Sequence, residues 1–172
     1  IIVKLRINPI IATLGTLLLF RGPAYVVSGG KNIVIGVNTW SYLGRGFIIG
    51  IPVSLIIYIV LLVLAYLFLR YTITGNYIYA IGGNSEACRN SGIKVDRLRF
   101  GVYIFTAMLS GVAGLILMSQ AGTATPVALS GAELDIIAAV LLGGISLSGG
   151  RGSLLGTFLG GLLIGMINNA LI

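Results

Sequence analysis

The chain has 172 residues, of which 57% are hydrophobic and only 9% are charged, and its mean hydropathy is +1.07. Soluble domains carry about 25% charged residues, so this composition excludes an ordinary soluble domain and predicts an all-α membrane protein. The net charge of +7 is then expected at the cytoplasmic ends of membrane spans, and not on a nucleic-acid-binding face. With no His and one Cys, Cys88, the sequence excludes His-dependent catalysis, a zinc cluster and an intrachain disulfide.

The chain opens on Ile instead of Met and ends at Ile172 within an apolar run. We therefore expect it to be an excerpt of a longer membrane subunit, with residues 1–172 forming part of a single transmembrane domain. Five apolar segments predict a polytopic bundle of transmembrane helices, some of them short or broken.

The first two apolar segments differ in length. Residues 7–20 fall short of the roughly 20 residues that a span needs, so they predict a short or broken helix that ends before Arg21. Residues 22–46 are dense in Gly and predict an interfacial loop instead of a pair of strands. Residues 47–69 carry no charge and predict the clearest spanning helix, with Pro52 in its first turns, where proline costs little.

Three further apolar segments follow in the second half of the chain. Residues 100–120 predict a full span, and so do residues 153–172. Between them, residues 136–147 are interrupted by Gly143 and Gly144, which predicts a short, broken helix. Such a helix is tolerated at membrane depth only inside protein or beside water, so this one predicts a wall of a polar pathway.

Glycines recur at four-residue spacing along the last segment, among them Gly156 and Gly160. On a helix these positions share one face and let a neighbouring backbone approach closely. The neighbour is either another helix of the same chain or a second subunit, and the spacing fits both.

Two acids, Glu133 and Asp135, precede the broken helix, in a stretch from 121 to 135 that has no basic residue. That composition is typical of the outer face. At the start of a helix both carboxylates are favoured by the helix dipole, so capping is one interpretation. The other places them at an outer mouth or a partner's docking site. They do not form a convincing hydrolytic pair.

Residues 71–99 form a polar, Gly-rich and basic stretch between two spans. Asn84 is a good N-cap, Glu86 then lies in the first helical turn, and Gly92 is the natural residue to end the helix. These residues predict a helix over 85–91, too short to be stable alone, which must be held against the membrane core or against a partner. The alternative is a turn that only connects two spans, although a connector needs far fewer residues.

The distribution of cations orients the chain. With residues 71–99 in the cytoplasm and the spans alternating, three cations, Arg21, Lys31 and Arg45, fall outside. Eight fall inside, which satisfies the positive-inside rule, whereas the inverted orientation violates it. The inner cations are Lys4, Arg6, Arg70, Arg89, Lys94, Arg97, Arg99 and Arg151.

Three motifs resemble the membrane permeases of bacterial ABC importers for ribose, xylose, arabinose and galactosides. They are TGNYIYAIGGNSEA at 74–87 with SGI at 91–93, GAELDIIAAVLLGG at 131–144 with GGRG at 149–152, and the stretch 156–169 with its Asn168–Asn169 pair. TLGT at 13–16 with Arg21–Gly22 is a weaker match. The sequence departs from the pattern at Cys88 and Arg89, where small and hydrophobic residues are common, and at Asn76, which replaces a usual Arg.

The resemblance implies the translocation subunit of an ABC importer, which moves a monosaccharide or similar small polar solute into the cytoplasm by alternating access. It implies a multi-pass protein of the bacterial inner membrane, in contact with lipid and not with nucleic acid. Its partners would be a second permease subunit (a homodimer or a heterodimer), one or more ABC ATPase subunits, and a periplasmic or lipid-anchored sugar-binding protein. ATP and Mg would then bind the partner ATPase, so this chain is expected to have no catalytic residue, cofactor or metal of its own.

The resemblance also implies site residues. The ATPase-coupling loop would comprise Gly82, Gly83, Asn84, Ser85, Glu86, Ala87, Cys88, Arg89, Ser91 and Gly92. Candidate pathway or helix-packing residues are Thr13, Gly143, Gly144, Gly156, Gly160 and Asn168, and the candidate outer-face acids are Glu133 and Asp135.

Two other classes of function compete. A secondary transporter or channel that needs no ATPase predicts ionisable residues inside the spans, and the three predicted full spans contain none. A membrane-embedded enzyme needs a nucleophile and a base side by side, and the sequence offers no such pair. The Gly-rich run ending at Gly152 lacks the spacing and the Lys of a phosphate-binding P-loop, so we read no nucleotide site there.

Overall fold

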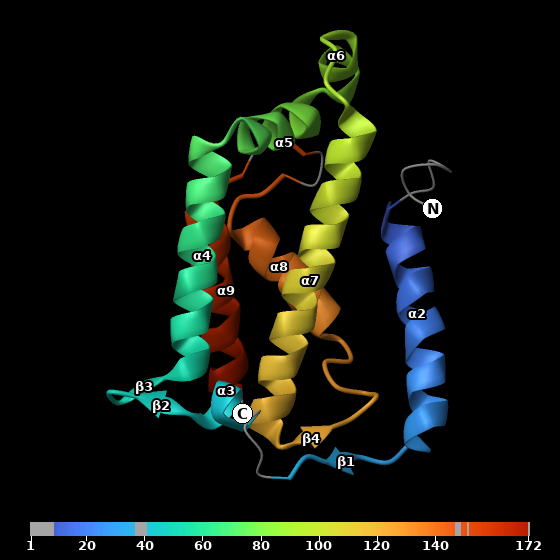
Figure 1. Cartoon of the computed structure of the whole chain (residues 1–172), viewed down its shortest axis with the longest axis vertical. Coiled ribbons are helices and arrows are strands. Elements are labelled where there is room, and N and C mark those ends of the chain that lie inside the picture. The colour runs from blue at the N-terminus through green and yellow to red at the C-terminus, as the bar shows by residue number, and fades with distance from the viewer. Residues whose placement is uncertain (1–8, 37–40, 147–148, 151, 172) are drawn as a thin grey trace. The chain divides into compact units, whose positions relative to one another are not determined.

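The computed structural model describes residues 9–36, 41–146, 149–150 and 152–171 (Figure 1). It confirms an all-α membrane protein: α2 (Pro9–Ser28), α4 (Val53–Tyr71) and α7 (Val95–Ala121) are long and apolar enough to cross a membrane, and each strand has only two residues. The chain divides into two compact units. One contains residues 1–63 and 99–128, and the other contains residues 64–98 and 129–172.

In the first unit, α2 does not end at Phe20 as predicted but continues to Ser28. A single Arg does not terminate a helix, and Pro23 removes only one backbone donor from it. The helix ends where Gly29 and Gly30 take positive φ and their amides donate to the carbonyls of Val26 and Tyr25, at 3.2 and 3.0 Å. This is the Schellman arrangement, which satisfies carbonyls that the last turn leaves free.

The predicted helix over 47–69 begins six residues late. Residues 47–52 form an antiparallel hairpin of β2 (Phe47–Ile48) and β3 (Ile51–Pro52), and α4 starts at Val53. Both residues at the tip, Ile49 and Gly50, have positive φ, as tight hairpin turns require. The prediction was wrong here because apolar composition alone does not distinguish a short hairpin from the first turns of a span.

Contacts distant in sequence hold the end of α7 in the first unit. The Gly44 amide, in α3 (Ser41–Arg45), donates to Ser119 Oγ at 2.8 Å, and Arg45 Nε donates to the Gln120 carbonyl at 3.0 Å. An added Cβ at Gly44 would lie 2.5 Å from the Gln120 nitrogen, so this contact needs glycine. Beside it, β1 (Ile33–Val34) pairs antiparallel with β4 (Thr123–Ala124). In the described part of residues 22–46, Ile33 and Val34 therefore pair with a segment that is distant in sequence.

In the second unit, the predicted polar loop over 71–99 is largely helical. It contains α5 (Ile73–Gly83), α6 (Ser85–Asn90) and the beginning of α7, which starts five residues before the predicted Phe100. Thr72 Oγ1 caps α5 by accepting from the Gly75 amide at 3.0 Å, and α5 turns away from α4 at this point (Figure 1). A single capping Thr inside a Gly-rich stretch was too weak a signal to predict α5.

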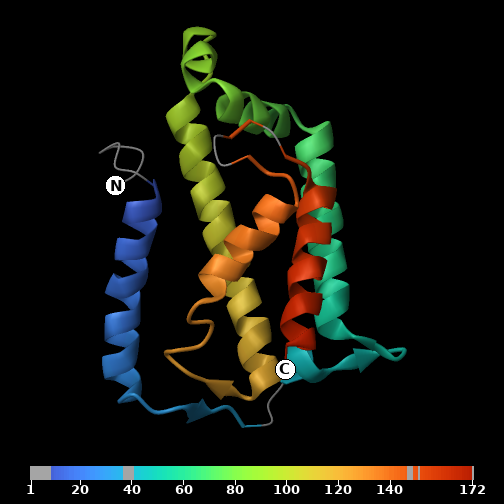
Figure 2. The same cartoon turned by 180° about the vertical axis from the view of Figure 1, so that it is seen from behind.

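The other elements of this unit are α8 (Ala132–Leu142) and α9 (Leu154–Ala170), which lie against each other (Figure 2). α8 begins four residues before the predicted start at 136 and ends at Leu142. α9 has 17 residues, so it is shorter than the predicted span over 153–172. Ser153 sets its start as the N-cap, with Oγ accepting from the Gly156 amide at 3.0 Å.

The glycine face of α9 packs against α8 of the same chain. An added Cβ at Gly160 would lie 2.8 Å from the Gly143 nitrogen and closer still to the Ala139 carbonyl oxygen. At Gly161, the next position, an added Cβ has no neighbour within 4 Å. Close backbone packing within one chain thus accounts for Gly160, as small residues do between membrane helices.

We expect Gly160→Ala to lower the free energy of unfolding of the intact protein by about 1–3 kcal/mol, because the new methyl must force α8 and α9 apart. Gly161→Ala is the matched control, and thermal unfolding in detergent is the measurement. Equal midpoints for the two variants would contradict the packing described above.

Candidate functional site

The short helix α6 has the cap geometry that the sequence predicted. Asn84 Oδ1 accepts from the amides of Glu86 and Ala87, at 3.1 and 2.9 Å, and Gly92 takes φ +82° just beyond the end. Asn84 also closes the preceding helix, because its own amide donates to the Ala80 carbonyl at 3.0 Å. One residue therefore ends α5 and begins α6, which fixes the turn between the two helices.

A small apolar cluster anchors α6. Cys88 packs with Ile81 of α5 and Val95 of α7, and all three are buried, with Val95 only 2% exposed. Ile93 and Leu98 lie against this cluster. Because six helical residues are not stable alone in water, the cluster is what holds α6 in place. Among the predicted coupling residues, Cys88 thus faces inward and supplies no surface to a partner.

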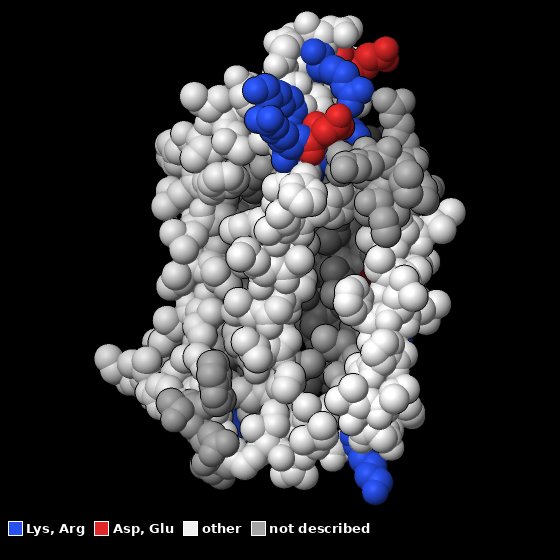
Figure 3. Space-filling view, turned by 45° about the vertical axis from the view of Figure 1, so that its right-hand side comes forward, with Lys and Arg blue, Asp and Glu red and all other residues white. Residues whose placement is uncertain are grey.

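The other side of α6 is exposed and charged. Glu86 and Arg89 are exposed, and Arg89 Nη2 lies 3.0 Å from Oδ1 of Asp96, in the first turn of α7. Figure 3 shows that charged side chains on the visible face gather over α6 and the beginning of α7. The sequence analysis did not predict this ion pair, because Arg89 and Asp96 lie in different helices and are brought together by the turn at Gly92. Both side chains are half exposed, so the pair stabilises the turn by less than about 1 kcal/mol.

A backbone contact joins the end of α5 to the glycine turn between α8 and α9. An added Cβ at Gly82 would lie 2.6 Å from the Gly150 nitrogen, and one at Gly149 would lie 2.7 Å from the Gly82 oxygen. Gly149 and Gly150 also have positive φ, at 85° and 76°. At Gly83, in contrast, an added Cβ meets nothing within 4 Å. We call this the Gly82–Gly150 contact. In the sequence, only the adjacent glycines at 82–83 and at 149–150 pointed to this contact.

Five of the six candidate pathway or packing residues, all but Thr13, belong to the second unit. Gly143 faces the start of α9, where an added Cβ would lie 2.5 Å from the Gly156 oxygen, whereas the same atom on Gly144 would have open space. Thr13 is in α2, in the other unit. Ser148 and Arg151, in the glycine turn of the second motif, lie outside the described residues.

The two acids have separate partners. Glu133 Oε2 accepts from the Gly131 amide at 2.8 Å, so this carboxylate lies at the start of α8, whose N-cap residue is Gly131. Asp135 Oδ2 accepts from Asn168 Nδ2 at 3.1 Å, which ties the start of α8 to the end of α9. Within the described ranges, no cluster of three or more His, Cys, Asp or Glu residues could hold a metal ion.

The whole chain, residues 1–172, matches the family model described as branched-chain amino acid transport system / permease component. It is 45% identical to the ribose import permease protein RbsC of Bacillus subtilis over 173 residues, which cover 99% of this chain and 54% of that protein. RbsC of Escherichia coli K12 is 39% identical, with the same coverage. The L-arabinose transport system permease protein AraH of Escherichia coli K12 is 36% identical, over 99% of this chain and 52% of that protein.

The chain spans about half the length of these relatives. No solved structure matches it. The match over all of its residues, together with three helices able to cross a membrane, shows that the chain belongs to this family of membrane transport permeases.

Proposed function

We propose that this chain is the translocation part of an ABC importer subunit, which moves a monosaccharide or similar small polar solute into the cytoplasm by alternating access. The observation that carries the proposal is α6: a short, capped helix anchored on one side and exposed and charged on the other. The relatives named for ribose import and L-arabinose transport support the sugar class. In this proposal a separate ATPase subunit binds ATP and Mg and supplies the energy.

Charge supports the placement of α6 in the cytoplasm. Arg70 lies near the end of α4, and Lys94, Arg97 and Arg99 lie at the start of α7. At the other end of α7, one cation, Arg45, lies beside the helix and donates to the Gln120 carbonyl. Arg21, assigned above to the outer side, lies inside α2, which lowers the count of outer cations and favours the same orientation. The protein is then a multi-pass protein of the bacterial inner membrane.

The Gly82–Gly150 contact offers a route for the energy. If an ATPase docks on α6, its movement passes along α5, which Asn84 joins to α6 without a flexible linker. α5 meets the turn between α8 and α9 backbone to backbone, so no side chain can absorb the displacement.

A second permease subunit and a periplasmic or lipid-anchored sugar-binding protein complete the importer in this proposal. Two arrangements of the α8–α9 pair, biased by the ATPase, would open the pathway to one side or the other.

The proposal predicts that uptake depends on the ATPase. The intact permease, reconstituted in proteoliposomes with its ATPase and sugar-binding protein, should accumulate labelled ribose or arabinose only when ATP is inside. Vesicles that lack the ATPase are the control. Uptake of equal rate in those vesicles would contradict the proposal and favour a secondary transporter or channel.

Gly82→Ala and Gly83→Ala test the route through α5. The methyl of Gly82→Ala meets the Gly150 backbone, whereas that of Gly83→Ala meets open space. We expect Gly82→Ala to keep the ATPase bound and hydrolysing ATP but to lower the uptake rate about tenfold, which corresponds to about 1.4 kcal/mol. Gly83→Ala should transport like the unmodified protein. Equal uptake by both variants would exclude the Gly82–Gly150 contact as the route.

A further inference from the structure

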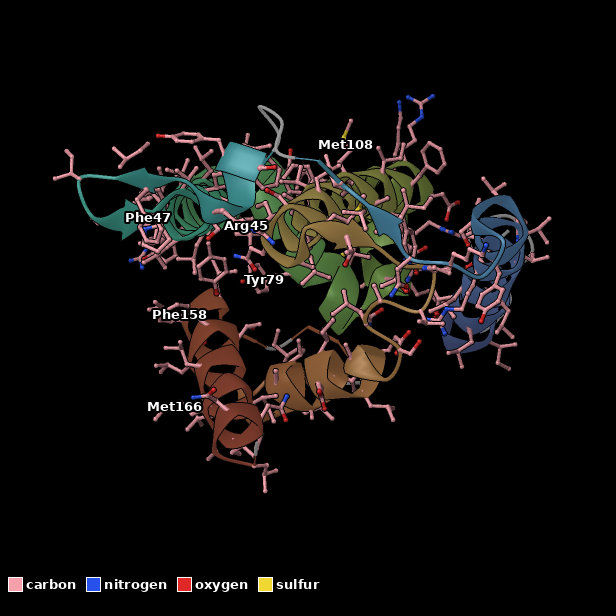
Figure 4. The ribbon with its side chains drawn as sticks, turned by 90° about the horizontal axis from the view of Figure 1, so that it is seen from below. Arg45, Phe47, Tyr79, Met108, Phe158 and Met166 are labelled. Atoms are coloured by element: carbon pink, nitrogen blue, oxygen red, sulfur yellow. The ribbon has the colours of Figure 1, made fainter. Side chains whose placement is uncertain are left out.

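A cavity of about 410 Å³ lies in the second unit, between the end of α4, α5 and the start of α9. Five polar residues line it, namely Tyr66, Arg70, Asn76, Tyr79 and Ser153, and Tyr79 comes from α5 (Figure 4). The apolar side chains of Leu69 and Leu154 line the same cavity. None of the transport steps proposed above uses it.

Arg70 brings a positive charge that the described part of the chain leaves unneutralised. Its Nη1 donates to the Tyr66 hydroxyl at 2.5 Å, and its guanidinium carbon lies 5.7 Å from the centre of the Tyr66 ring. These contacts fix the side chain but use one of its five N–H donors. No described carboxylate forms an ion pair with it, in contrast to Arg89, which is paired with Asp96.

The other polar groups also present donors. Within the described residues, no hydrogen bond occupies the side-chain amide of Asn76 or the hydroxyl of Tyr79. Ser153 Oγ accepts from Gly156 and keeps its own O–H available. The cavity is thus lined by one positive charge and several hydrogen-bond donors, namely a guanidinium, an amide, a phenol and a hydroxyl. Such a lining is complementary to a ligand with one negative charge and several acceptor oxygens. Phosphate has this chemistry, and Arg binds it bidentately.

The level of the cavity in the membrane indicates the source of the phosphate. Arg70 is the last residue but one of α4, a 19-residue helix with a mean hydropathy of 2.5 that is long enough to cross a membrane. Its position at the end of this helix therefore places the guanidinium at the level of the lipid headgroups. We propose that this cavity is a phosphate site that binds the headgroup of an anionic phospholipid. The site depends on the fold alone and not on the transport proposal.

The test is lipid binding to the intact, detergent-solubilised permease, measured by native mass spectrometry during titration with phosphatidylglycerol. We expect Arg70→Ala to weaken the tightest binding about tenfold, since it removes a charged hydrogen bond. Tyr79→Phe removes a single hydroxyl, preserves the packing and should weaken binding about threefold, so the test survives if Arg70→Ala does not fold. Arg89→Ala is the matched control: it removes the same charge from a cation that Asp96 already neutralises.

A second arm uses inorganic phosphate. If millimolar phosphate leaves the bound lipid in place, the source is the lipid headgroup, as proposed. If phosphate itself binds in an Arg70-dependent way and the lipid does not, the phosphate chemistry stands and the source is a soluble phosphate. Equal losses in Arg70→Ala and Arg89→Ala, or no loss in Arg70→Ala and Tyr79→Phe, would overturn the site.

Discussion

Close approach of one backbone to another, at positions where only glycine fits, is the constraint on which the second unit depends. Gly143, Gly156 and Gly160 bring α8 and α9 together, and Gly82 brings α5 against Gly149 and Gly150. Between membrane helices there is little hydrophobic driving force, because lipid is as apolar as a Leu side chain. Dispersion between closely packed backbones then has to supply the attraction. A methyl added at one of these glycines separates the two backbones and weakens that attraction. The Asp135–Asn168 hydrogen bond adds one polar contact across the α8–α9 pair.

The exposed helix α6 combines local order with little stability of its own. Its Asn84 cap and the Cys88–Ile81–Val95 cluster hold it in one orientation, while its charged face remains available. Such an element can transmit a displacement only if its connections are rigid, and here the connection is a single residue that caps two helices.

Features set by neighbouring residues could be predicted from the sequence. Asn84, Glu86 and Gly92 define α6 through cap chemistry that acts over a few residues, and the apolar segments identify helices. Helix ends set by backbone turns were missed, as at the hairpin tip of Ile49 and Gly50. Contacts between residues far apart in sequence, such as Gly82 with Gly150 or Asp135 with Asn168, could not be predicted, because no periodicity relates their positions.

The proposed docking of an ATPase on α6 is tested most directly by site-specific cross-linking. Glu86 is exposed on α6, and Val34 is exposed on β1, in the other unit. In intact permease carrying Cys88→Ala, a cross-linker attached at Glu86→Cys should capture the ATPase subunit in membranes, and one at Val34→Cys should not. Capture from Val34→Cys with none from Glu86→Cys, or equal capture from both, would contradict the assignment.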